Sequence, residues 1–167
     1  HWKHRRQRQM CIRDRSFLPV LKGQRDIHHE VVFAMHTTRG IYHGSEAFGI
    51  RAATDGDWLY IRNLHPHIAF ENMVTGRGRE YHSWKEVESS FARDRVSLYQ
   101  RRPAEELFFL PDDPWCLENR AGEVEGGILS SKLDAWMKQQ GDLGDATERD
   151  AENRQPEYKP WSKKGRY

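Results

Sequence analysis

The side chains best suited to chemistry follow an apolar run in the first third of the chain. They are His36, Thr37, Thr38 and His43, in a loop that also carries glycines. Imidazole and hydroxyl groups donate and accept hydrogen bonds, and recognition groups usually lie on such loops. We therefore predict that these four residues bind a substrate. A structural loop held by the threonine hydroxyls fits the same pattern equally well.

Arg102 is a second candidate for binding an anion. Its planar guanidinium can bind sulfate or carboxylate through two parallel hydrogen bonds. Glu105 and Glu106 follow closely in the chain. An ion pair between Arg102 and a neighbouring glutamate on the surface is the interpretation that the sequence favours.

Nine histidines and two cysteines predict no metal site. No two histidines have the i, i+4 spacing of a metal-binding helix. The cysteines, Cys11 and Cys116, support neither a disulfide framework nor a metal cluster. We expect solvated or hydrogen-bonded histidines, and we predict no catalytic residue in this chain.

The composition is polar for a globular protein. The 167 residues are 37% hydrophobic with a mean hydropathy of −0.94, which allows about one domain with a core. No apolar run approaches the roughly 20 residues of a membrane span, so we expect no membrane partner. Residues 1–15 hold six of the 27 basic residues and one of the 25 acidic ones. The remaining 21 and 24 would give a formal charge of −3 in place of +2.

This basic head has two interpretations. Residues 6–16 resemble translated sequencing-adapter sequence, which favours a non-native head at 1–15 and no nucleic-acid partner. The alternative is a small stand-alone module that binds an anionic partner through the head and through Trp2, Trp84 or Trp161. Binding of that kind would weaken with salt and with deletion of the head.

Residue patterns predict four strands. β-Branched and aromatic runs of strand length occur at 31–36, 48–54, 58–64 and 107–110. The second and third runs are separated by Asp55-Gly56-Asp57, a strong hairpin signal. After the fourth run, Pro111 and Pro114 bracket two aspartates and predict a tight turn.

Helical patterns complete the predicted fold. Ser83 precedes a helix expected to reach about Arg101. A later helix carries an apolar stripe of Ile128, Leu129, Leu133, Trp136 and Met137. The predicted class is α+β, with a small antiparallel sheet of about four strands packed against a C-terminal helix. We assign 16–141 to this domain, 65–82 to a surface insertion and 142–167 to a polar tail.

Three segments together resemble the C-terminal part of formylglycine-dependent sulfatases. The turn region is similar to their "ELYDLxxDPxExxNLA" signature in Glu106-Leu107-Phe108-Phe109-Leu110, Asp113-Pro114, Leu117-Glu118-Asn119 and Ala121. His36-Thr37-Thr38-Arg39-Gly40-Ile41 and Arg102-Pro103-Ala104-Glu105-Glu106 resemble the subgroup of N-sulfoglucosamine sulfohydrolases (heparan N-sulfatases). The likeness covers about 16–155. Two departures are Phe109 in place of the usual Asp and Cys116 in place of a common Glu.

The resemblance implies a sulfatase C-terminal subdomain of an alkaline-phosphatase-like fold. Its parent would hydrolyse sulfamate or sulfate ester groups on a glucosamine-containing glycan, so a sulfated glycan is the implied substrate. The formylglycine nucleophile and the calcium ion are expected in a missing N-terminal catalytic domain, which is the implied partner. The family also implies a periplasmic, lysosomal or extracellular location.

The nucleophile motif Cys/Ser-x-Pro-x-Arg of this family is matched only at its outer positions. Arg15 lies four residues after Cys11, and Arg120 lies four residues after Cys116, but neither segment contains the proline. With arginine so frequent, chance explains both matches. The fragment alone is expected to be inactive.

Overall fold

The chain divides between Glu30 and Val31 into two units, residues 1–30 and 31–167. The computed structural model describes residues 16–37 and 48–153. In the first unit, Pro19 occupies the first turn of the short helix α2, Leu18–Leu21. The predicted head at 1–15 lies outside the described residues. The sheet unit begins at Val31, and the domain boundary at residue 16 stays a prediction.

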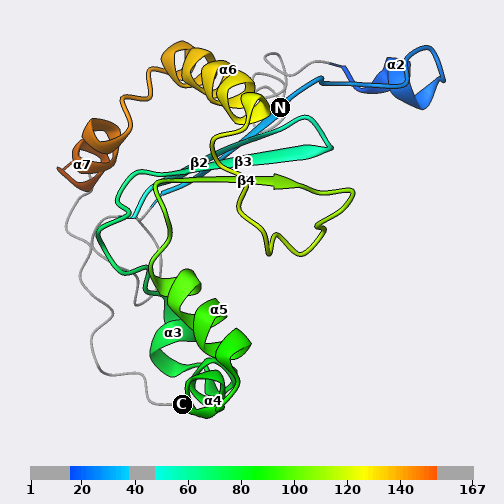
Figure 1. Cartoon of the computed structure of the whole chain (residues 1–167). Helices are drawn as coiled ribbons and strands as arrows, with labels where there is room; N and C mark the ends of the chain where they lie inside the picture. The colour runs from blue at the N-terminus through cyan, green and yellow to red at the C-terminus, as the bar shows by residue number, and fades with distance from the viewer. Residues whose placement is uncertain (1–15, 38–47, 154–167) are drawn as a thin grey trace, which may run out of the picture. The chain divides into compact units, whose positions relative to one another are not determined.

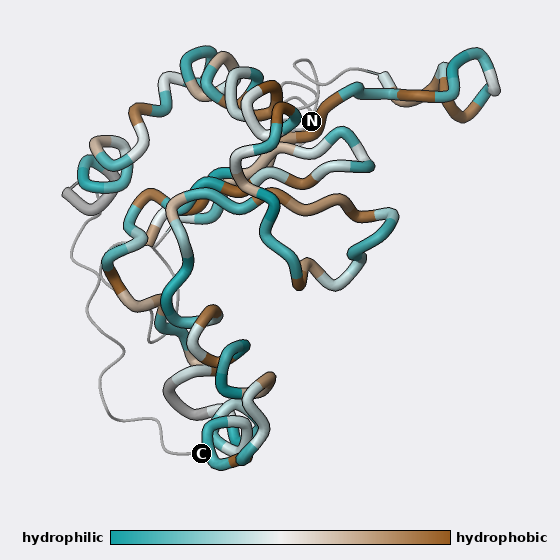
Figure 2. The backbone as a smooth tube through the Cα atoms, in the orientation of Figure 1, coloured by the Kyte–Doolittle hydropathy of each residue, from teal (hydrophilic) through white to brown (hydrophobic). Residues whose placement is uncertain are grey.

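The second unit is built on a four-stranded antiparallel sheet (Figure 1). Its strands are β1 (Val32–His36), β2 (Ile50–Thr54), β3 (Trp58–Asn63) and β4 (Glu105–Phe109), in that spatial order. Apolar and polar stretches are interspersed along them (Figure 2). The α+β class, with about four antiparallel strands and a C-terminal helix, is confirmed.

The predicted hairpin joins β2 to β3. The Asp55 carboxylate accepts hydrogen bonds from the backbone N–H groups of Asp57 at 3.2 Å and Trp58 at 2.8 Å. Gly56 has a φ of 107°, a conformation that glycine adopts without steric cost. Local hydrogen bonding therefore fixes the register of the hairpin.

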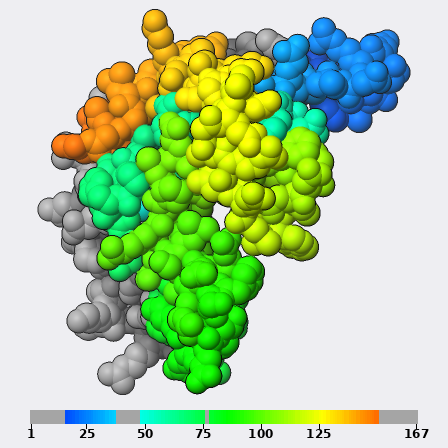
Figure 3. Space-filling model, in the orientation of Figure 1, coloured from blue at the N-terminus to red at the C-terminus, as the bar shows by residue number. Residues whose placement is uncertain are grey.

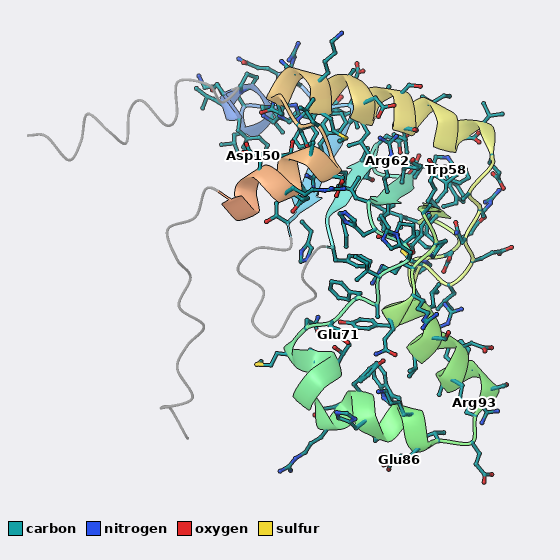
Figure 4. The ribbon with its side chains drawn as sticks, turned by 90° about the vertical axis from the view of Figure 1, so that its left-hand side faces the viewer. Trp58, Arg62, Glu71, Glu86, Arg93 and Asp150 are labelled. Carbon is teal, nitrogen blue, oxygen red and sulfur yellow. The ribbon has the colours of Figure 1, made fainter. Side chains whose placement is uncertain are left out.

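Helix α6 (Val124–Gln140) covers one face of the sheet over β2 and β3. Its buried residues Leu129, Leu133 and Met137 recur every four positions and pack against Tyr60 and Leu107 of the sheet. The stripe predicted from the sequence was too wide, because Ile128 is 51% exposed. On the sheet beneath α6 lie Arg62 and Trp58 (Figure 4).

Three helices leave the sheet between β3 and β4. They are α3 (Met73–Arg77), α4 (Arg79–Glu86) and α5 (Ser90–Gln100). The single helix predicted from Ser83 is wrong, because Ser89 caps a new helix by accepting a hydrogen bond from Ala92 N–H. The segment 65–82, predicted as a surface insertion, also contributes buried residues, Phe70 and Tyr81.

The segment after α6 is also structured. Helix α7 spans Asp145–Asn153, and the side chains of Asp142 and Glu148 are buried. The sequence predicts a polar tail from residue 142 that is wrapped over the surface or disordered. In the structure, Arg51 of the sheet holds 142–153 through Asp142 and Glu148. Residues 154–167 lie outside the described part. Helices α3 to α5 and helices α6 and α7 lie at opposite ends of this unit, with the sheet between them (Figure 3).

In the part of the chain that the structure describes, no helix combines the length and the apolar character needed to cross a membrane.

Candidate functional site

The ends of all four strands meet at one end of the sheet. The last residue of β1, His36, lies opposite Ile50, and Ile50 lies opposite Asn63. The N–H of Asn63 donates to the carbonyl of Ala104 at 2.8 Å, two residues after Arg102. We call this part of the sheet the sheet end. It brings together the candidate residues His36 and Arg102, which are 66 positions apart in the sequence.

His36 is half-buried at the sheet end. Its ring lies 5.9 Å from the ring of Phe70, centroid to centroid. The Nε2 atom is buried and forms no hydrogen bond with any residue that the structure describes. Since buried polar atoms are normally hydrogen-bonded, this nitrogen can form a hydrogen bond with a bound molecule.

Arg102 contacts the same aromatic ring. Its guanidinium carbon lies 5.8 Å from the ring centroids of both Phe70 and Tyr99, within cation–π distance. One terminal nitrogen lies 3.6 Å from a carboxylate oxygen of Glu106. The pairing with a nearby glutamate is confirmed, but Glu106 is only 3% exposed and also accepts a hydrogen bond from Asn63 at 2.7 Å. The expected surface pair is thus a partly buried one.

Phe70 is the centre of an aromatic cluster, which we define as Phe48, Phe70, Tyr81 and Tyr99. Phe70 contacts Phe48 at 5.0 Å and Tyr99 at 5.8 Å, and Tyr99 contacts Tyr81 at 5.8 Å. Burial, and secondarily the neighbouring Tyr99, raise the pKa of Tyr81. Sequence reasoning missed this cluster. Aromatic residues inside an otherwise polar insertion were the available signal.

The remaining predicted site residues follow β1. Thr37 comes directly after the strand and is half-buried. Thr38 and His43 lie outside the described residues. His36 and Arg102 therefore both contact the ring of Phe70. The contribution of the other loop residues stays a prediction.

The sheet end offers binding groups. An imidazole nitrogen and a guanidinium beside aromatic rings suit an anionic or hydroxyl-bearing ligand. Cys116 lies elsewhere, and burial, with the nearby charges of Asp113 and Glu106, raises the pKa of its thiol. A protonated thiol is a weak nucleophile. Within 16–37 and 48–153, no three His, Cys, Asp or Glu side chains converge to hold a metal ion.

Arg51 ties the sheet end to the C-terminal segment. Its fully buried guanidinium contacts both Asp142 oxygens, at 2.5 and 3.2 Å, and Glu148 at 2.8 Å. The other terminal nitrogen donates to the backbone carbonyls of His36 at 3.3 Å and Ile50 at 3.1 Å. We call Arg51, Asp142 and Glu148 the ionic clamp. It fixes the backbone of the candidate residue His36.

Two further features hold the segment 142–153, which carries Asp142 and Glu148 of the clamp, against the sheet. A Cβ atom at Gly49 would lie 2.9 Å from a carboxylate oxygen of Glu148, so glycine leaves room for the clamp. His65 Nε2 lies 2.5 Å from the carboxylate of Asp145 at the start of α7. Hydrogen bonds from Arg149 and then His65 lower the pKa of Asp145.

Because the ionic clamp depends on ionised carboxylates, we expect the folded chain to be less stable in acid. Burial opposes ionisation of Asp142, but hydrogen bonds from Arg51 and Gly144 outweigh it and hold the pKa of Asp142 below its ordinary value. A carboxyl with a lowered pKa stabilises the fold above its unfolded pKa, and that contribution disappears as pH falls through the folded value. The free energy of unfolding should therefore fall as pH drops below about 4. Urea unfolding from pH 6 to pH 3 measures this dependence.

The Asp142→Asn variant is the control for this prediction. Because it has no titrating carboxyl at this position, its stability should depend less on pH over the same range. The lowered pKa values of Asp113 and Asp145 leave some dependence in the variant. Equal slopes in the two proteins would show that Asp142 is not paired as described.

No family model matches the sequence, and no curated protein matches it significantly.

Proposed function

We propose that this chain is the C-terminal subdomain of a formylglycine-dependent sulfatase resembling N-sulfoglucosamine sulfohydrolases. The parent hydrolyses sulfamate or sulfate ester groups on a glucosamine-containing glycan. In this proposal the subdomain supports the catalytic domain and places His36 at the rim of the substrate pocket. The nucleophile and the calcium ion belong to the catalytic domain, and the residues of this chain only bind and orient.

The turn after β4 supports the proposal, because the residues of the resemblance have defined structural roles there. The side-chain oxygen of Asn119 accepts from Leu107 N–H at 2.9 Å and Ala121 N–H at 3.0 Å, and its amide donates to Glu105 at 3.1 Å. The Asp113 carboxylate accepts from two further backbone N–H groups, at 2.7 and 2.9 Å. These two side chains fold the turn.

The sheet face opposite α6 also supports a covering domain. Strands β1, β2 and β3 present apolar side chains there. Val32 is 55% exposed and Ala34 is exposed, while Ala52, Leu59 and Ile61 are half-buried. A contiguous apolar surface of this kind is typical of a face that packs against another protein part. We propose that the catalytic domain of the same chain packs on it.

The unpartnered Nε2 of His36 is the observation that carries the site assignment. A sulfate, sulfamate or sugar hydroxyl group would supply the hydrogen bond that the nitrogen lacks. Arg102, which contacts the same Phe70 ring, would favour the negative charge of such a group. The ionic clamp would keep the His36 backbone in place while the ligand binds.

Replacing His36 with alanine in the full-length parent should lower kcat/KM for an N-sulfated glucosamine disaccharide by about ten- to a hundredfold. The estimate corresponds to the loss of one hydrogen bond to a charged group. The steady-state rate of sulfate release measures it. His67→Ala is the matched control, because His67 is exposed and should leave kcat/KM unchanged. A His36→Ala enzyme with the wild-type kcat/KM would refute the assignment.

A further inference from the structure

The outer edge of β1 carries backbone groups that pair with no residue within 16–37 or 48–153. The N–H of Leu64 donates to Gly49 at 2.9 Å, and the N–H of Asp55 to Trp58 at 3.3 Å, so odd-numbered residues of β2 bond β3. Bonding alternates along an antiparallel ladder, so even-numbered residues of β2 bond β1. Through the register, Ala34 bonds inward to Ala52. The backbone groups of Phe33 and Met35 therefore point away from the sheet.

At the opposite edge of the sheet, outward backbone groups of β4 form hydrogen bonds. On β4, the outward N–H of Leu107 donates to the side chain of Asn119 at 2.9 Å, and its carbonyl accepts from Arg120 N–H at 2.8 Å. The carbonyl of Glu105 accepts from the amide of Asn119. On β1, no described residue forms a hydrogen bond with the outward groups of Phe33 or Met35. Among the described residues, the outward backbone groups of β4 are therefore hydrogen-bonded and those of β1 are not.

Nothing in the sequence of β1 protects this edge. Proteins usually guard a free edge with lysine, proline or a bulge. The strand Val-Phe-Ala-Met-His has no lysine or proline, and its pairing with β2 is continuous from Val32 to His36. Val32 and Met35 are 55% and 49% exposed. Another β-strand is the partner that fits such an edge.

We propose that β1 pairs with β1 of a second copy of this chain, antiparallel and with Ala34 on the two-fold axis. In that register Phe33 lies opposite Met35 of the partner. The outward groups of these two residues then form four hydrogen bonds across the axis, using every free donor and acceptor of the strand. Only the register with Ala34 on the two-fold axis pairs all of these groups of Phe33 and Met35 with each other.

The side chains of β1 are compatible with the same register. Ala34 faces its own counterpart, and a small residue suits the close approach of a non-hydrogen-bonded pair. No Lys, Arg, Asp or Glu lies on the strand, so no charges of the same sign would meet. A two-fold contact between identical surfaces is the commonest arrangement in soluble oligomers. This pairing uses the edge of the sheet and does not rest on the proposed function.

Multi-angle light scattering of the 167-residue chain over a range of concentrations tests the proposal. The wild-type chain should form a dimer that dissociates on dilution. Ala34→Lys and Ala34→Glu each place two like charges face to face, which should weaken the dimer roughly two- to fivefold. An equimolar mixture of the two variants should form a heterodimer tighter than either homodimer. Leu143→Lys, at a 77% exposed apolar position outside β1, should behave as wild type.

Met35→Pro provides an independent test. Its N–H points outward, so proline removes two of the four hydrogen bonds and leaves the pairing with β2 intact. The dimer should weaken by about tenfold or more, while the far-UV circular dichroism spectrum stays that of the wild type. A wild-type chain that is monomeric at every concentration would overturn the proposal. Dimers as tight in Ala34→Lys as in wild type would overturn it as well.

Discussion

Replacing Arg51 with methionine should lower the free energy of unfolding by about 3–5 kcal/mol, the usual cost of removing one partner of a buried ion pair. The variant would keep much of the side-chain volume and lose the charge. Asp142 and Glu148 would then lose the Arg51 guanidinium while only 5% and 4% of their side chains are exposed. Urea unfolding followed by circular dichroism measures the change.

Arg120→Met is the matched control for this experiment. Arg120 forms two hydrogen bonds with the carboxylate of Glu123. Both side chains are more than a third exposed, at 34% and 39%. Exposed pairs contribute about 0–1 kcal/mol. Equal losses in the two variants would contradict the ionic clamp.

The second large effect is expected at Leu133. This side chain is fully buried between α6 and the sheet, so Leu133→Ala should lower the free energy of unfolding by about 2–5 kcal/mol. The loss combines the transfer of the missing methyl groups to water with the cavity that remains. The same urea titration measures it.

Ile128→Ala on the same helix separates burial from helix propensity. Ile128 is 51% exposed, so its truncation should change the stability by no more than about 0.5 kcal/mol. A comparable loss in both variants would mean that α6 packs on the sheet through a different face.

The sheet could be predicted from the sequence because its signals are local. Alternation and β-branched residues mark the strands, and the Asp55-Gly56-Asp57 turn gives the register of β2 with β3. The break between α4 and α5 was missed. Ser83 and Ser89 both suit an N-cap, and the extended backbone at Val87, with a ψ of 135°, ends the first helix before the second begins.

The candidate site was predictable only in part. His36 and Arg102 could be selected by residue type, but their contact with Phe70 depends on the folding of the helices between β3 and β4. The ionic clamp joins residues 91 positions apart, Arg51 and Asp142. No local pattern links such residues, and the charged segment after Gly141 has the composition of a tail.

Sequencing the source DNA upstream of the codon for Ser16 tests the central claim most directly. The sulfatase proposal predicts an open frame that continues upstream into a Cys/Ser-x-Pro-x-Arg motif and paired aspartates for calcium, in place of residues 1–15. A genuine start codon followed by the codons for His1 to Arg15 would contradict it. The chain would then be a small protein with a basic head, and binding to an anionic partner would become the function to test.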